Sequence, residues 1–267
     1  MMKIVTFIGF IVSLFLLTAC ETVPETGRSQ LLLISSGEEM QLGFSEFEKM
    51  KKNTPISKDK DLTDMVNRVG RRVASVAKLP GARWEFVLFD QPKTANAFCL
   101  PGGKVGIYTG ILPITQTEAG LATVLAHEVA HAVARHGAER MSEGMLVKLG
   151  GQVVSILASE KSAETQALIN SSYGLGSTLG VMLPHSRKQE LEADHIGVLY
   201  MARAGYPPEE AIAFWQRFSE HNGKKGNTRA AEFFSTHPVD STRIRELQRL
   251  LPQAQREYRK ATGSPIR

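Results

Sequence analysis

The segment from Leu121 to Gly137 constrains the fold of this chain more than any other. It reads LATVLAHEVAHAVARHG, in which apolar residues surround two histidines four positions apart. Because residues four apart lie one turn above each other on a helix, His127 and His131 can bind one metal ion through both imidazoles. Glu128 is rotated by about 100° from His127 and can reach a metal-bound water instead. The segment therefore predicts a core helix with two metal ligands and a general base.

The third ligand distinguishes the classes of zinc hydrolase. A metzincin requires Gly at 134 and His at 137, where this chain has Ala134 and Gly137. His136 is one position out of register, and we interpret it as a histidine of the last helical turn, favoured by the helix dipole. A thermolysin-like enzyme requires an acid about twenty residues beyond the second histidine, and residues 149–154 contain none. Neither pattern fits.

A downstream acidic segment supplies further candidates. Between Ser186 and Gly197, Glu190 and Asp194 are four apart and share a helix face, whereas Glu192 is rotated by about 200° from Glu190 and is expected to point away. Glu190 is then expected to complete the metal site, and Asp194 to orient a ligand histidine. Two alternatives stay open: a charged, solvent-exposed face for this segment, and Cys99 as third ligand, as in peptide deformylase.

The rest of the pattern predicts an α+β fold that is mainly helical. A helix is expected to open at Ser36, and an amphipathic helix follows through 62–76. A capping box at Thr115 is expected to open the helix with the two histidines. The glycine-rich segment 171–180 is open to two interpretations, a lid or a packed helical turn. Three β-rich runs predict a small sheet of about three strands: Trp84–Phe89, Asn96–Leu100 and Lys104–Thr109.

The N-terminus has the pattern of a secretion signal. Lys3 precedes an apolar run from Ile4 to Leu17, shorter than the ~20 residues that a helix needs to cross a bilayer. The following Leu-Thr-Ala-Cys resembles the lipobox of bacterial lipoproteins, so Cys20 is the expected lipid anchor; an ordinary signal or short anchor with an incidental cysteine is the alternative. Glu21, rather than Asp, favours sorting to the outer membrane.

The two motifs together resemble the HtpX and CAAX-prenyl-protease type of zinc peptidase, peptidase family M48. The resemblance covers about 96–243 of the chain. Unlike HtpX and the prenyl proteases, this sequence has no other run that is long and apolar enough to span a membrane, so it resembles the family's bacterial lipoprotein branch. The resemblance is carried by His127-Glu-x-x-His131, Glu190-x-x-Ala-Asp194, Asn96-Ala-Phe98, Tyr108-Thr-Gly110 and Ser235-Thr-His-Pro238.

The resemblance implies a gluzincin-type fold with the small sheet beside the His-Glu-x-x-His helix. It also implies one Zn²⁺ per chain, bound by His127, His131 and Glu190. Glu128 would take a proton from a zinc-activated water that attacks a peptide carbonyl. His237 is expected to stabilise the oxyanion or to act as a displaceable fourth ligand, with helix capping as a third possibility. Substrate is expected to pair as an extended strand with an edge formed by Asn96, Ala97 and Phe98.

These inferences predict a zinc-dependent endopeptidase that hydrolyses misfolded or unassembled cell-envelope polypeptides at the periplasmic face. The alternative is a zinc-stabilised assembly chaperone without proteolysis; Glu128 favours the peptidase, because a structural site needs no base. The net charge is +5 with interleaved acids and bases, which gives no basic stripe for nucleic acid. The expected organisation is a signal peptide (1–19), a lipidated N-terminus and linker (20–35), the metallopeptidase domain (36–252) and a tail (253–267).

Overall fold

The computed structural model describes residues 20–158, 186–223, 233, 237–238 and 240–263. Two compact units are present: residues 1–36 with 137–183, and residues 37–136 with 184–267. The expected signal peptide and the glycine-rich segment 171–180 lie outside the described residues. Across the described residues, no helix combines the length and the apolar character that crossing a membrane requires.

The first unit contains a β-hairpin within the segment 20–35, where the sequence led us to expect a linker. Strands β1 (Cys20–Thr22) and β2 (Ser29–Leu31) pair antiparallel. Arg28, beside β2, donates from Nη2 to Oε2 of Glu139 at 2.9 Å, and Glu139 belongs to α6 (His136–Ala158). Both side chains of this ion pair are largely buried. The expected linker thus contains regular structure, because a tertiary ion pair fixes a segment whose composition alone predicts a coil.

The second unit is mainly helical and contains a three-stranded sheet, as predicted for an α+β fold. The helix expected from Ser36 and the three expected strands are all present. In chain order its elements are α2 (Ser36–Asn53), α3 (Lys60–Ala74), β3 (Glu85–Phe89), β4 (Ala97–Leu100), β5 (Lys104–Tyr108), the 3₁₀-helix η1 (Thr109–Ile111), α4 (Leu112–Thr115), α5 (Glu118–Val133), α8 (Arg187–Arg203), α9 (Glu209–Gly223) and α11 (Ser241–Thr262).

The sheet has the strand order β3-β5-β4, with β3 parallel and β4 antiparallel to β5. A short turn joins β4 to β5, and its Gly102 and Gly103 have φ values of +82° and +80°. Only glycine adopts such angles without strain, which explains the Pro-Gly-Gly sequence of this turn. The order leaves β4 as an outer strand of this described sheet.

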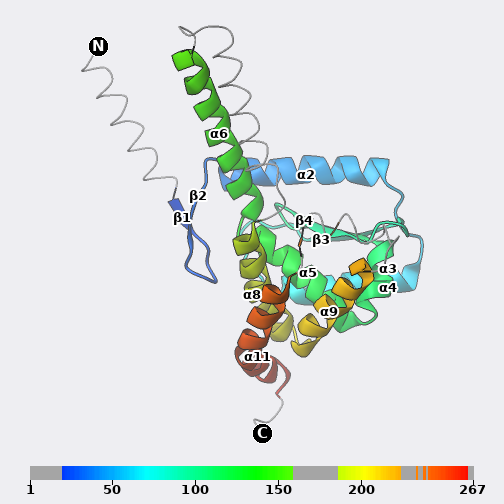
Figure 1. The fold of residues 1–267 in the computed structure, drawn as a ribbon. Coiled ribbons are helices and arrows are strands. Elements are labelled where there is room, and N and C mark those ends of the chain that lie inside the picture. Colours follow the sequence, from blue (N-terminus) through cyan, green and yellow to red (C-terminus); the bar gives the residue numbers. More distant parts are fainter. Residues whose placement is uncertain (1–19, 159–185, 224–232, 234–236, 239, 264–267) are drawn as a thin grey trace. The chain divides into compact units, whose positions relative to one another are not determined.

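Helices cover both faces of the sheet. Phe47 of α2 packs against Val87 and Phe89 on one face. On the other face, Gly70 of α3 lies directly against the ring of Phe86. Figure 1 shows α2 and α5 on opposite sides of the strands, and α5 contacts β4. Burying each of these aromatic side chains contributes about 1.5–3 kcal/mol, which stabilises the packing of α2 and α3 on the sheet.

Helix α5 is buried on all sides from Gly120 to Val133. Its N-cap is Thr117, whose hydroxyl accepts a hydrogen bond from the Gly120 N–H at 3.0 Å. The expected cap at Thr115 was wrong, because Thr115 ends α4. The expected end at Gly137 was also wrong: α5 ends at Val133, and Arg135 takes the left-handed region at φ +55°. The chain therefore turns sharply before α6.

Helix α11 begins after Asp240, whose Oδ1 accepts from the N–H groups of Thr242 and Arg243 at 2.8 and 3.1 Å. It continues through Pro252 to Thr262. The residues expected to form a tail after 252 are therefore helical as far as Thr262. The start of this helix places the preceding loop, with His237, beside α8.

Candidate metal centre

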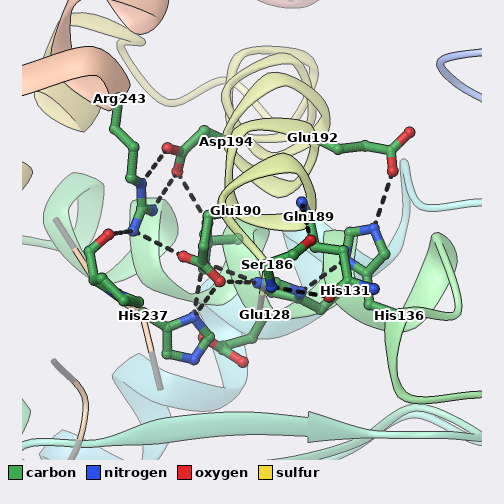
Figure 2. Close-up of polar contacts among 12 residues, drawn as sticks. Glu128, His131, His136, Ser186, Gln189, Glu190, Glu192, Asp194, His237 and Arg243 are labelled. Atoms are coloured by element: carbon green, nitrogen blue, oxygen red, sulfur yellow. Dashed lines mark hydrogen bonds and ion pairs between the residues drawn. The ribbon is translucent and has the colours of Figure 1, made fainter. Parts of the chain in front are cut away.

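Four buried side chains bring their donor atoms together in the second unit. His127 and His131 come from α5, Glu190 from the first turn of α8, and His237 from the loop before α11. Their ligand atoms lie within 4.8 Å of one another, and each side chain is at most 6% exposed. Figure 2 shows the carboxylate of Glu190 directed toward His131 and His237. The structure thus unites the three ligand candidates with His237.

The spacing of these donors fits a four-coordinate zinc ion. The Nε2 atoms of His127 and His131 are 3.1 Å apart, and Nδ1 of His237 lies 3.2 Å from His127 Nε2. Oε1 of Glu190 is 3.2 Å from His131 Nε2 and 3.0 Å from His237 Nδ1. Tetrahedral ligands at the Zn–N distance of ~2.0–2.1 Å lie about 3.3–3.4 Å apart. Nitrogen lone pairs that face each other so closely repel unless a cation or protons lie between them.

Local sequence positions Glu190 against α5. Ser186 caps α8 through a capping box with Gln189, which puts Glu190 in the first turn. Gly197 lets the two helices approach closely, since a Cβ at this position would lie 3.1 Å from the Cα of His127. That distance is tighter than ordinary van der Waals contact. A glycine at this point of α8 therefore sets the depth at which Glu190 meets the histidines.

Arg243 of α11 binds two carboxylates of α8, those of Asp194 and Glu190 (Figure 2). Its Nε and Nη2 donate to Asp194 at 2.6 and 2.7 Å, and its Nη1 lies 2.7 Å from Glu190 Oε2. The guanidinium stacks 3.9 Å from the ring centroid of Trp215. The sequence analysis assigned no role to Arg243; the available signal was that Glu190 and Asp194 would need a nearby cation if they faced the core. It neutralises charge that burial would otherwise make unfavourable.

Asp194 lies beside the first histidine. Its Oδ1 is 3.0 Å from His127 Nδ1, although the ring nitrogen is not well aligned for a hydrogen bond. Burial raises the pKa of Asp194, but the adjacent Arg243 outweighs it and holds the pKa below its usual value. Burial likewise raises the pKa of Glu190, and its hydrogen bonds to the three histidines outweigh it, so this pKa is lowered. Both groups are therefore ionised acceptors.

His136 occupies a position that the sequence analysis described wrongly, and Glu192 has a buried partner that it did not predict. His136 was expected in the last turn of the metal-binding helix; instead it opens α6, and its Nδ1 lies 2.8 Å from Nδ1 of His131. Glu192 was expected to point away from the site; it is buried, and its Oε2 lies 3.0 Å from His136 Nε2. Helical rotation correctly separates it from Glu190 but does not show that another residue folds over that face.

Glu128 lies beside the four donors without joining them. Its side chain is about 5% exposed, its Oε1 has no hydrogen-bond partner among the described residues, and Nε2 of His237 is 3.4 Å from this atom. Burial raises the pKa of Glu128, partly offset by the neighbouring His237 and His127. A buried carboxylate oxygen with unused acceptor capacity next to a metal site is suited to accept a proton from water.

The other candidates are distributed more widely. Cys99 on β4 is not among the donors, and burial raises the pKa of its thiol, which disfavours the thiolate that metal binding needs. Asn96 immediately precedes β4, and Ala97 and Phe98 begin that outer strand. Cys20 is exposed at the start of β1. The cap of α11 is Asp240, so the possibility that His237 caps this helix was wrong.

Comparison with known proteins gives a consistent result. The profile described as Peptidase family M48 matches residues 60–251, which include all four donors. The mitochondrial metalloendopeptidase OMA1 of Schizosaccharomyces pombe is 41% identical over 190 residues, covering 71% of this chain and 53% of that protein. OMA1 of Saccharomyces cerevisiae is 31% identical, covering 95% and 75%. The Beta-barrel assembly-enhancing protease of Escherichia coli K12 is 28% identical, covering 85% and 46%. The chain thus spans about half the length of the first and third relatives.

Proposed function

We propose that this chain, which belongs to peptidase family M48, is a zinc metalloendopeptidase that hydrolyses peptide bonds of misfolded or unassembled cell-envelope proteins with Glu128 as general base. The observation that carries the base assignment is the position of Glu128: it is buried, adjacent to the ligand His127 and not itself a donor. His127, His131 and Glu190 are the proposed zinc ligands.

When bound, Zn²⁺ lowers the pKa of a coordinated water toward ~7 and polarises a carbonyl as a Lewis acid. Glu128 accepts the proton of the attacking water at Oε1 and returns it to the leaving amine. Its buried setting raises the pKa of Glu128, which brings the carboxyl closer to the range useful for proton transfer at neutral pH. Asp194 and Arg243 hold His127 and Glu190 in place.

His237 is proposed to be a displaceable fourth ligand. Its Nδ1 completes the donor set, while its Nε2 faces Glu128 Oε1 at 3.4 Å. Four protein ligands are typical of closed structural sites, whereas catalytic zinc sites keep one position open. The position of Nδ1 among the other donors supports a resting state in which His237 would occupy the position that water or substrate needs. Substrate binding would then have to move the 237–238 segment.

Substrate is proposed to add a strand to β4. This strand is outermost in the described sheet, and α5 packs beside it. Main-chain pairing at an edge accepts many sequences, which suits unfolded polypeptides. Asn96 already directs its carbonyl to the Tyr108 N–H at 3.0 Å, so the pairing edge toward β5 is in use and the opposite edge is the one offered.

The envelope location rests on two observations. Leu17-Thr-Ala-Cys20 has the lipobox pattern, and Cys20 is exposed in the structure. The E. coli relative is named a β-barrel assembly-enhancing protease, and barrels of this kind are typical of outer membranes. The two yeast relatives, in contrast, are named mitochondrial enzymes, and the proposed envelope location does not rest on them. Loss of membrane attachment on Cys20→Ala, with wild-type protein in the outer-membrane fraction, is the result expected of a lipid anchor.

The test of the function compares the purified protein with Glu128→Gln on unfolded casein and on a folded control protein. We expect Glu128→Gln to lower casein hydrolysis by about 10²–10⁴-fold with one zinc retained per chain. The amide matches the carboxylate in size, so folding is preserved. Equal hydrolysis by both proteins would contradict the role of Glu128. Hydrolysis by neither would indicate either a resting site closed by His237 or a zinc-stabilised protein that holds its clients without cleaving them, and only the closed site would gain hydrolysis on His237→Ala.

A further inference from the structure

The second zinc ligand of α5 has an outer partner of an unusual kind. Nδ1 of His131 lies 2.8 Å from Nδ1 of His136, and Nε2 of His136 lies 3.0 Å from Oε2 of Glu192. The three side chains are at most 6% exposed. Figure 2 shows this chain on the side of His131 away from Glu190. It is separate from the Asp194–Arg243 pair that supports His127.

Zinc binding would fix the direction of both hydrogen bonds in the series His131–His136–Glu192. His131 faces the other donors with Nε2, so a neutral His131 must carry its proton on Nδ1. Nδ1–H then donates to His136 Nδ1, which must be the acceptor. His136 consequently carries its own proton on Nε2 and donates it to Glu192. A neutral imidazole has one N–H, and therefore no other arrangement satisfies all four nitrogens.

The backbone conformation at Arg135 places His136 beside His131. Arg135, directly before it, adopts φ +55°, an angle that residues with a Cβ rarely take. The Arg135 side chain is held by Glu39 of α2, with Nε donating to Oε2 at 2.8 Å, and both side chains are nearly buried. Without this reversal α5 would continue, and residue 136 would project about 140° around the helix from residue 131. A strained turn fixed by a buried ion pair is typical of functional positions.

We propose that His136 and Glu192 are positioning residues for zinc, acting as a relay that fixes the ring orientation and the Nδ1–H tautomer of His131. The inference rests on the proposed zinc site. Outer partners of this type also raise the basicity of the ligand nitrogen. They accept a hydrogen bond from the other ring nitrogen, and this increases the electron density of the imidazole ring. The usual partner is a carboxylate or carbonyl. Here an imidazole is interposed, so the ligand depends on two residues from two further elements, α6 and α8.

The relay is tested by zinc affinity of the full-length chain in detergent, measured by competition with a chelator. His136→Leu removes the acceptor for His131, whereas His136→Asn is the matched control, since Asn Oδ1 can accept near the position of Nδ1. We expect His136→Leu to weaken zinc binding by about 10–100-fold and His136→Asn to remain within about threefold of wild type. Thermal unfolding of the metal-free proteins reports separately whether both variants fold.

Glu192 offers a second pair of variants that keeps the test decisive if His136→Leu does not fold. Glu192→Gln retains an acceptor for His136 Nε2–H, and Glu192→Leu does not, so only the latter should weaken zinc binding. Zinc affinity of both leucine variants within twofold of wild type would overturn the relay, as would equal losses in His136→Leu and His136→Asn. Failure of the wild-type chain to bind zinc would overturn the metal site itself, a different result.

Discussion

Arg243 and Asp194 form a bidentate ion pair in the interior of the second unit, although they are 49 positions apart in the sequence. Nε and Nη2 of Arg243 donate to the two oxygens of Asp194 at 2.6 and 2.7 Å, and both side chains are about 2–3% exposed. The planar guanidinium can also reach Glu190, which a lysine ammonium could not do in the same geometry. Arg243 thus contacts both a proposed metal ligand, Glu190, and the partner of another proposed ligand, Asp194 beside His127.

Replacement of Arg243 by methionine is therefore predicted to destabilise the protein by about 3–5 kcal/mol, because it leaves Asp194 and Glu190 buried without their cation. Arg243→Lys should recover part of the stability but not the zinc affinity. Chemical denaturation and chelator competition measure the two effects. Arg249 pairs with Glu246 on the exposed face of the same helix, so Arg249→Met is the control and should change stability by less than about 0.5 kcal/mol. Equal effects at the two positions would contradict this account.

Gly197→Ala is predicted to weaken zinc binding more than it affects folding. The added Cβ would lie 3.1 Å from the Cα of His127, so α8 must move by a few tenths of an ångström and carry Glu190 with it. Overpacking of about 1–3 kcal/mol is partly offset by the helix propensity of alanine, about 0.5–1 kcal/mol. Thermal unfolding and zinc affinity are the measurements.

Gly137 of α6 provides the matched control for that substitution. A Cβ at Gly137 would meet nothing within 4 Å, so Gly137→Ala should stabilise its helix slightly and leave zinc affinity unchanged. If Gly197→Ala also left zinc affinity unchanged, the close approach of α8 to His127 would have no role in positioning Glu190.

Local patterns explain which parts of the fold could be predicted. The spacing of His127 and His131, and the alternation in the three strands, depend on neighbours within a few residues, and the helices and the sheet follow from them. The strict helical spacing also placed Glu190 and Asp194 on one face. Family resemblance added the expectation that this face meets α5, which periodicity alone does not give.

The parts that were missed depend on contacts between distant residues. His136 and Glu192 are 56 residues apart and meet only because Arg135 takes a left-handed conformation. An arginine carries no sequence signal for such a φ value, since the tertiary pair with Glu39 imposes it. The hairpin of β1 and β2 was missed for the same reason: its order depends on Arg28 reaching α6.

Zinc binding is predicted to release a proton near neutral pH. Burial alone would lower the pKa of His127, but Asp194 and Glu190 outweigh it and raise the pKa to about 9 in the metal-free protein. His127 is then charged at about pH 7.5 and must lose a proton to bind zinc. Calorimetry in two buffers of different ionisation enthalpy should count about one proton released, with zinc affinity rising as pH increases toward 9. Zero protons released would contradict the raised pKa.

The raised pKa of His127 gives the stability of the metal-free protein the opposite pH dependence to that of zinc affinity. A raised histidine pKa contributes stability that is fully present below the unfolded value of about 6.5 and is lost as pH rises through about 9. The melting temperature of the metal-free protein should therefore fall over this interval, while the stabilisation added by zinc grows. Melting curves with and without a chelator at several pH values measure both trends.

His237→Ala distinguishes a displaceable fourth ligand from a catalytic group. The Nδ1 of His237 lies 3.2 Å from His127 Nε2, and Phe233 anchors the histidine by accepting its backbone N–H at 2.7 Å and packing 4.4 Å from its ring. If His237 closes the site, its removal leaves three ligands and an open position, and casein hydrolysis should rise while zinc affinity falls. If His237 stabilises the oxyanion, hydrolysis should fall by about 10²–10³-fold, and most of this loss should appear in kcat, with a smaller change in KM. A decrease with every substrate tested would exclude the closing role, because a closed resting site must gain activity when its fourth ligand is removed.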